Sequence, residues 1–223
     1  MGVDGMERQA WHRKNLEEIN RRLQWLRDKP EGVLYEKKTA FNRAVVVKKG
    51  SQIHLYFTGF RAGTGEPRMS GVMSRIDLDD PLDLPAVYTQ AMMLTLLWRE
   101  DPERICMLGY GGGRIAMVFH HFLPEVVIDC VEIDPDIVDL SEVFFGVKPG
   151  GRLRVFVQDA REFVETLPGG TRYDNPQGSP SPVILFAILF RMSVTLWSFL
   201  SPTIAISMPS SFATSLSGTV SFV

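Results

Sequence analysis

The sequence predicts an α/β protein in which a small N-terminal β domain precedes a parallel, doubly wound sheet. Alternating or β-branched runs crowd residues 33–60, and strands then alternate with helices from residue 103 onward. A glycine-rich turn joins the first of those later strands to the helix that follows it. The alternation stops after residue 174, so we expect the parallel sheet to be incomplete at its C-terminal side.

Each predicted element rests on a local pattern. In the first helix, apolar residues recur every three to five positions from Trp11 to Leu26, and Pro30 ends the pattern. Residues 61–85 are rich in Gly, Pro, Asp and Ser, which predicts a loop. Strands are expected at 33–37, 43–48, 52–58, 104–108, 126–132 and 153–158, and helices at 6–28, 86–98, 113–122, 135–145 and 160–166.

These patterns divide the chain into four segments. The last differs sharply in charge from the rest, which the average composition does not show. The segments are an N-terminal helix (1–32), a small β domain with a trailing loop (33–85), a parallel-sheet domain (86–174) and a low-charge tail (175–223). The tail holds one charged side chain, Arg191, together with eleven serines and five prolines.

Charge and cysteine content exclude several classes of protein. The 223-residue chain has a formal net charge of −2, which argues against a general electrostatic grip on nucleic acid or an anionic membrane. Its two cysteines, Cys106 and Cys130, rule out a disulfide scaffold and a four-cysteine zinc site, and we expect no metal. The charged N-terminus lacks the apolar core of a secretory signal, so a cytoplasmic setting is expected.

A glycine-rich turn is the strongest local signal for chemistry. The stretch CMLGYGGGR places glycines at 109, 111, 112 and 113, directly between a buried strand and a helix. Glycine lets a ligand approach bare backbone, and the N-terminus of the helix offers free N–H groups. The loop lacks the lysine and the serine or threonine of an ATP-binding P-loop, which disfavours ATP hydrolysis.

Two acidic residues follow the next two strands. Glu132 ends the second strand of the parallel sheet, where a carboxylate accepts both hydroxyls of a ribose. Asp159, with Ala160 after it, ends the third strand and could accept a hydrogen bond from an exocyclic amine; its alternative role is to cap the next helix. Glycines, Glu and Asp at three successive strand ends predict a site for a nucleoside-containing ligand.

The stretches MLGYGGGRIAMVFHHFLPEVVIDCVEIDP and RVFVQDAREF resemble the spermidine/spermine synthase (polyamine aminopropyltransferase) family, and most closely its divergent spermidine-synthase-like branch. The resemblance covers roughly residues 33–174. It implies a Rossmann-like, methyltransferase-type domain and decarboxylated S-adenosylmethionine as a substrate. By position, Gly109, Gly111 and Gly113 match the cofactor loop, Glu132 the ribose-binding acid, and Asp159 with Ala160 the adenine side.

The chain departs from that family where the amine would bind. The family's Tyr-Gln pair is Phe41-Asn42 here, and of its acidic motif before the glycine loop only Tyr88 is kept. A cationic amine without carboxylate partners binds poorly. Asp80 and its acidic neighbours could substitute in part, although such residues also suit a turn. The substrate residues we predict are therefore Tyr88, Asn42 and Asp80.

No catalytic residue can be assigned. The resemblance implies a base, an aspartate at the end of the fourth strand, but no acidic residue follows Asp174. Three interpretations of the tail stay open: a change of reading frame or splicing after Asp174, which we favour, a buried fourth strand at 183–190, and a membrane span at 183–200. A span would hold Arg191 near its centre at a cost of about 2.5–3.5 kcal/mol.

Three functions are compatible with these residues. The first is an aminopropyltransferase-like protein whose transfer activity is impaired, binding decarboxylated S-adenosylmethionine or methylthioadenosine. The second is an S-adenosylmethionine-dependent methyltransferase, because the same loop and acids suit that ligand equally well. The third is a non-catalytic protein that dimerises with a full-length relative. For the chain itself, a homodimer through the N-terminal β domain is the expected assembly.

Overall fold

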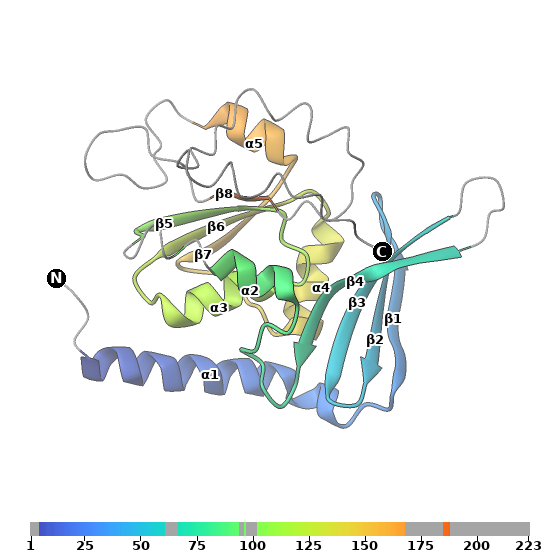
Figure 1. Cartoon of the computed structure of the whole chain (residues 1–223), viewed down its shortest axis with the longest axis horizontal. Coiled ribbons are helices and arrows are strands. Elements are labelled where there is room, and N and C mark those ends of the chain that lie inside the picture. The colour runs from blue at the N-terminus through green and yellow to red at the C-terminus, as the bar shows by residue number, and fades with distance from the viewer. Residues whose placement is uncertain (1–4, 61–66, 94–95, 97–101, 168–184, 188–223) are drawn as a thin grey trace, which may run out of the picture.

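The computed structural model describes residues 5–60, 67–93, 96, 102–167 and 185–187 (Figure 1). The described helices are α1 (Gly5–Arg27), α2 (Val87–Met93), α3 (Arg114–Phe122), α4 (Pro135–Phe145) and α5 (Ala160–Thr166). The described strands are β1 (Gly32–Lys38), β2 (Arg43–Lys49), β3 (Gln52–Phe60), β4 (Pro67–Asp77), β5 (Arg104–Leu108), β6 (Val127–Glu132), β7 (Leu153–Val157) and β8 (Leu185–Ala187). The predicted helix at 86–98 is confirmed as far as α2, and residues 94–95 and 97–98 lie outside the described part.

The N-terminal sheet is antiparallel, with the strand order β1-β2-β3-β4. Its inner face is one row of paired residues that runs from Tyr35 through Val46 and Leu55 to Ser74. Val46 and Leu55 are fully buried, whereas Ser74 brings a hydroxyl to the end of the row. The same face that forms the core therefore places a polar group beside the second sheet.

The prediction of a loop over residues 61–85 is wrong for residues 67–77. Residues 67–77 form β4, which pairs with β3 along its length and has register shifts near Tyr56. Pro67 and Gly71 favoured a loop in the sequence, but β4 is an edge strand, where both residue types are tolerated. Strand β4 matters for function because it is the part of the first sheet that reaches the glycine loop.

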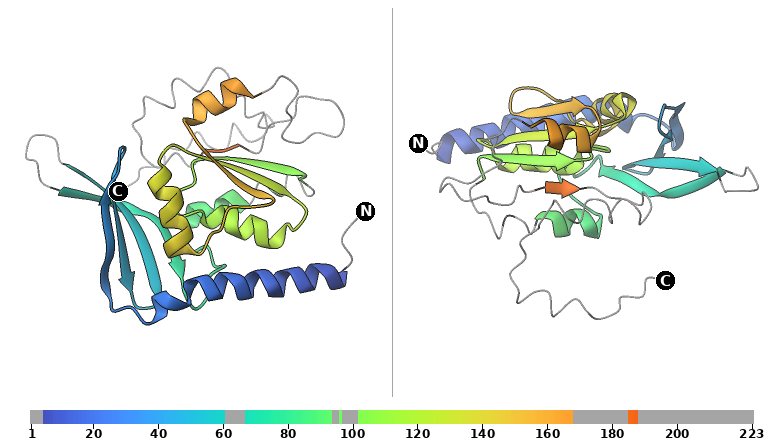
Figure 2. Two further views of the ribbon diagram at one scale, coloured as in Figure 1. Left: turned by 180° about the vertical axis from the view of Figure 1, so that it is seen from behind. Right: turned by 90° about the horizontal axis from the view of Figure 1, so that it is seen from above.

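The second sheet is parallel, with the strand order β7-β6-β5-β8 (Figures 1 and 2). Strand β8 pairs with β5 from Cys106↔Leu185 to Leu108↔Ala187. Three residues of the segment 183–190, for which a buried fourth strand was one of the open interpretations, thus join the sheet beside β5. The strand order reverses at β5, and ligands of doubly wound sheets bind at the carboxyl ends of strands beside such a point.

Helix α1 links the two sheets along their base (Figure 1). Its buried face, with Ile19, Leu23 and Leu26, belongs to the core that is shared with both sheets. The Lys48 ammonium of β2 donates to the carbonyls of Arg27 and Lys29 at 2.7 and 2.5 Å, so a cation caps the negative end of the helix dipole. These contacts fix the two sheets against each other and hence fix the seam at which the candidate site lies.

Apart from Leu185–Ala187, the tail at 175–223 lies outside the described residues, as does most of the candidate span at 183–200. Within the described part of the chain, no helix combines the length and the hydropathy needed to cross a membrane.

Candidate functional site

The glycine loop takes the conformations that its sequence predicts. Gly109, Gly111 and Gly113 have φ angles of 92°, 54° and 65°, a region that side chains disfavour. Gly113 also packs closely, because a Cβ there would lie 2.7 Å from Cζ of the Tyr110 ring. Gly113 precedes Arg114, the first residue of α3, so the loop delivers bare backbone to the N-terminus of that helix.

Glu132, at the end of β6, holds this loop directly. One of its carboxylate oxygens accepts hydrogen bonds from the backbone N–H groups of Tyr110 and Gly111 at 3.1 and 3.2 Å. The other accepts from the N–H of Asp134 at 3.1 Å. A carboxylate has about four acceptor positions, so three N–H donors leave capacity for a hydroxyl donor of a ligand. The structure therefore brings together two of the predicted site elements, the loop and Glu132.

Ser74 of β4 is the contact that the sequence did not reveal. Its hydroxyl oxygen accepts a hydrogen bond from the N–H of Gly112 at 2.9 Å. A Cβ at Gly112 would stand 2.6 Å from Cβ of Ser74, so only glycine permits this approach. No signal in the sequence pointed to Ser74 once its segment was taken for a loop.

A second seam joins the β1–β2 turn to the start of α4. The buried Asp134 caps α4 by accepting from the N–H of Asp136 at 3.1 Å, and it accepts from the Thr39 hydroxyl at 2.5 Å. The predicted substrate residue Asn42 is half-buried beside this pair, and its carbonyl accepts from the Thr39 N–H at 2.7 Å. Asn42 thus lies in the turn that contacts the carboxyl end of β6.

Arg114 is buried directly after the glycine loop and ties it to the segment before α2. Its guanidinium donates to the carbonyl of Asp83 at 2.7 Å and to that of Arg75 at 3.3 Å. Burial lowers the pKa of Arg114 to about 10, against the opposing effect of Asp83 and Asp80. The predicted substrate residue Asp80 is exposed, and its carboxylate accepts from the N–H of Leu82 within a turn.

Tyr88 contacts β4 beside Ser74, the residue that binds the glycine loop. Its hydroxyl donates to the carbonyl of Met73 at 3.2 Å, and burial raises its pKa. The neighbouring Thr89 hydroxyl donates to the carbonyl of Ala86 at 2.6 Å within the first turn of α2. Tyr88 is therefore positioned against β4, one residue away from the serine that touches the glycine loop.

At the end of β7, the acidic residue Asp159 binds the helix that follows it and not the glycine loop. The Asp159 carboxylate accepts from the N–H groups of Arg161 and Glu162 at 2.8 and 3.2 Å, which makes Asp159 the N-cap of α5 and Ala160 its first residue. The N–H of Gln158 donates to the carbonyl of Glu132 at 3.0 Å, so the two strand ends are adjacent. Asp159 is exposed, and capping is the role that its contacts describe.

Among the residues that the structure describes, no three His, Cys, Asp or Glu side chains gather as ligands for a metal ion. What the arrangement offers is a backbone cradle, a carboxylate with spare acceptor capacity, and neighbouring strand ends.

Comparison with known proteins agrees with this geometry. The chain matches no protein-family model. It is 37% identical over 101 residues to the polyamine aminopropyltransferase of Chromobacterium violaceum, a match that covers 45% of this chain and 39% of that protein. A second polyamine aminopropyltransferase, from Vibrio vulnificus, is 30% identical over 145 residues, which cover 64% of this chain and 46% of that protein. The chain is therefore similar in sequence to part of two polyamine aminopropyltransferases.

The chain also resembles a methyltransferase in part of its sequence and a solved structure in part of its fold. The human eEF1A lysine and N-terminal methyltransferase is 32% identical to this chain over 71 residues, which are 32% of this chain and 10% of that protein. A solved structure of a probable spermidine synthase from Corynebacterium glutamicum aligns with a TM-score of 0.49 at 18% identity, covering 65% of this chain and 50% of that one. The chain spans less than half the length of the two aminopropyltransferases that it matches.

Proposed function

We propose that this chain binds an adenosyl thioether or sulfonium ligand, methylthioadenosine or decarboxylated S-adenosylmethionine, at the carboxyl ends of β5 and β6. The observation that carries the proposal is the contact between Glu132 and the N–H groups of Tyr110 and Gly111. One ribose hydroxyl would donate to the remaining acceptor position of Glu132, while the bare backbone from Gly109 to Gly113 admits the chain that carries the sulfur.

A neutral loop suits such a ligand better than a pyrophosphate. The only cation directly after the glycines is Arg114, and its guanidinium is committed to the carbonyls of Asp83 and Arg75. A diphosphate would find no free cationic side chain there, whereas a sulfonium needs none. Among the predicted substrate residues, Tyr88 and Asn42 line the seam with the first sheet, where the acceptor amine would enter.

Aminopropyl transfer should be slow in this chain. An alkylamine is mostly protonated at pH 7, and a positioned base that removes the proton contributes about 10²–10⁴-fold in rate. No acidic residue follows Asp174 in the sequence, and we assign no base. Binding of the nucleoside without rapid turnover is therefore the expected behaviour.

The binding experiment compares the chain with two charge-neutralised variants by isothermal calorimetry with methylthioadenosine. Glu132→Gln should weaken binding by about 1.5–3 kcal/mol, the scale for a hydrogen bond to a charged group. Glu17→Gln, on the exposed face of α1, is the matched control and should bind like the parent chain. Equal affinity of the Glu132→Gln variant and the control would contradict the proposal.

A methyltransferase is the second candidate, and the similarity to the human methyltransferase favours it. The two functions differ in the product that they release. Incubation with an amine panel should release methylthioadenosine from decarboxylated S-adenosylmethionine if the first function holds. Release of S-adenosylhomocysteine from S-adenosylmethionine with a protein or amine acceptor would support the second function instead.

A further inference from the structure

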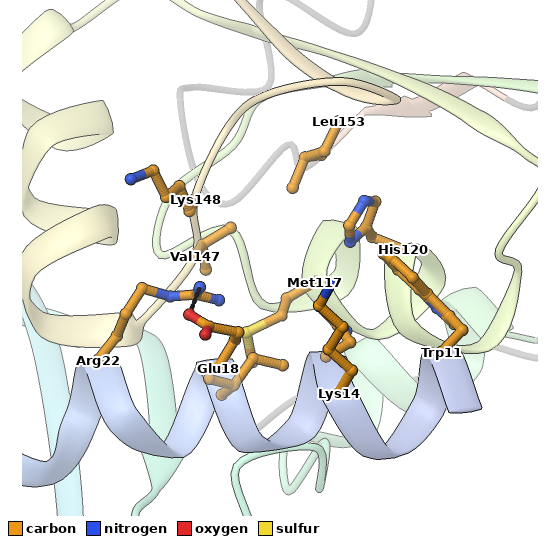
Figure 3. Close-up of a pocket in the computed structure, with 11 residues that line it drawn as sticks. Trp11, Lys14, Glu18, Arg22, Met117, His120, Val147, Lys148 and Leu153 are labelled. Atoms are coloured by element: carbon orange, nitrogen blue, oxygen red, sulfur yellow. Dashed lines mark ion pairs between the residues drawn. The ribbon is translucent and has the colours of Figure 1, made fainter. Parts of the chain in front are cut away.

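A second pocket lies at the opposite end of the parallel sheet from the nucleoside site. It is a cavity of about 190 Å³ between α1, α3 and the segment that leads into β7 (Figure 3). Its lining residues are Trp11, Lys14, Asn15, Glu18, Ile19, Arg22, Met117, His120, Val147, Lys148 and Leu153. Neither the glycine loop nor Glu132 contributes to it, so it is independent of the proposed function.

The inner walls of this pocket are apolar. Ile19, Met117, Val147 and Leu153 are buried there, and the Trp11 indole closes one end. The Trp11 N–H donates to the carbonyl of His121 at 3.0 Å, and the ring meets His120 edge-on at a centroid distance of 5.2 Å, so the indole is fixed. A dry apolar cavity of about 150 Å³ holds a benzene molecule, and this pocket is slightly larger.

The rim of the pocket is cationic. Lys14, Arg22 and Lys148 reach it from two segments, whereas Glu18 is the only carboxylate of the lining. Figure 3 shows Arg22 and Lys148 at the end away from Trp11 and His120.

The cations at the rim outnumber the one carboxylate of the lining. The Glu18 carboxylate contacts Arg21, outside the pocket, at 2.7 Å and Arg22 at 3.8 Å. The Arg22 Nε donates to the carbonyl of Gly146 at 2.8 Å, which holds that guanidinium in place. Lys148 is 3.9 Å from Glu142, which is not part of the lining. An anion at the rim would therefore meet one guanidinium that is held in place, together with the cationic side chains of two lysines.

We propose that this pocket binds a small arylcarboxylate, with the ring between Trp11 and the aliphatic walls and the carboxylate directed to Arg22 and Lys148. Shape selects one ring, because the volume is below the range of about 300–1,000 Å³ that is usual for larger ligands. Charge selects the anion over its neutral and cationic analogues. The occupied pocket would hold α1 more firmly against α3.

The test uses the full chain with three probes of the same shape: benzoate, benzyl alcohol and benzylamine. Calorimetry reports affinity, and the indole N–H resonance of Trp11 in ¹⁵N-tryptophan-labelled protein, assigned with Trp11→Phe, reports the place. We expect saturable binding of benzoate with a shift of that resonance, weaker binding of benzyl alcohol, and none of benzylamine.

Two variants are expected to change the affinity for benzoate in opposite directions. Damage to the fold would weaken binding in both, so the pair separates ligand contacts from such damage. The variant Lys148→Gln should weaken benzoate binding about twofold to fivefold, the scale of one exposed ion pair. Glu18→Gln should strengthen it about twofold to fivefold by removing the carboxylate of the lining. Arg13→Gln, one position along α1 and outside the lining, should change nothing.

Three results would overturn the proposal. They are an absence of saturable benzoate binding, binding that leaves the Trp11 resonance unshifted, and equal affinities in the Lys148 and Glu18 variants.

Discussion

The two ends of the parallel sheet are closed by different chemistry. At the carboxyl end, Glu132, Asp134 and Ser74 form directional hydrogen bonds to backbone N–H groups and to a hydroxyl. At the amino end, rings close the gap between α1 and α3: Trp11 meets His120 edge-on, and His12 stacks on His121 at 4.9 Å. Directional bonds leave acceptor capacity for a ligand, whereas ring packing at this end depends on His120 and His121 staying neutral.

The largest expected effect is a steric one at the carboxyl end. Gly113→Ala should lower the free energy of unfolding by about 2–5 kcal/mol, because it combines a left-handed φ of 65° with a clash against the Tyr110 ring. Gly50→Ala is the matched control, since Gly50 has a φ of 59° but open space around its Cβ position. It should cost about 1–2 kcal/mol in chemical denaturation. Equal losses would show that the close packing of the loop is unimportant.

The amino end should respond to pH. Burial lowers the pKa of His120 to about 4 from 6.5, with Arg152 and Arg22 acting in the same direction, and burial also lowers the pKa of His121. The unfolded chain therefore binds more protons between pH 6.5 and 4, so stability is full above pH 6.5 and is lost as pH falls through that window. After allowance for solvent screening, His120 should account for about 1–2 kcal/mol.

Urea unfolding at pH 7.5 and 4.5 measures this loss. His54 also has a pKa lowered by burial, so it contributes to the loss in the parent chain. The variant His120→Gln should therefore lose less stability than the parent over the same interval. An identical pH dependence of the two proteins would place the titration elsewhere.

Ser74→Ala tests the contact between the two sheets. The variant leaves the N–H of Gly112 without its partner, and we expect a loss of about 1–2 kcal/mol in stability. It should also speed amide exchange at Gly112 in hydrogen-exchange NMR. Unchanged exchange at Gly112 would mean that water replaces the serine at no cost.

The smallest effect concerns the third strand end. Asp159→Ala should destabilise the chain by about 1 kcal/mol through loss of the α5 cap, whereas Asp159→Asn should be nearly neutral because asparagine caps equally well. A selective loss of nucleoside affinity in Asp159→Asn, at unchanged thermal stability, would restore the adenine-side role that the sequence suggested.

Sequence reasoning reached the parts of the molecule that depend on local patterns. The loop glycines and the strand–helix alternation were predictable because local patterns fix them. Glu132 was predictable because an acid at the end of the second strand, at this spacing from a glycine loop, is typical of nucleoside sites. Ser74 and Thr39 were not, because their partners lie 38 and 95 positions away and a lone hydroxyl carries no pattern. Strand β4 was missed for a related reason: its proline and glycine mark a loop unless its place at the edge of the sheet is known.

The most direct test of the central claim is a titration of the ¹⁵N-labelled full chain with methylthioadenosine, read at both ends of the parallel sheet. The account predicts saturable shifts in the amide resonances of Tyr110, Gly111 and Gly113, and unchanged indole resonance of Trp11. Shifts confined to Trp11 and its neighbours on α1, with a silent glycine loop, would contradict it.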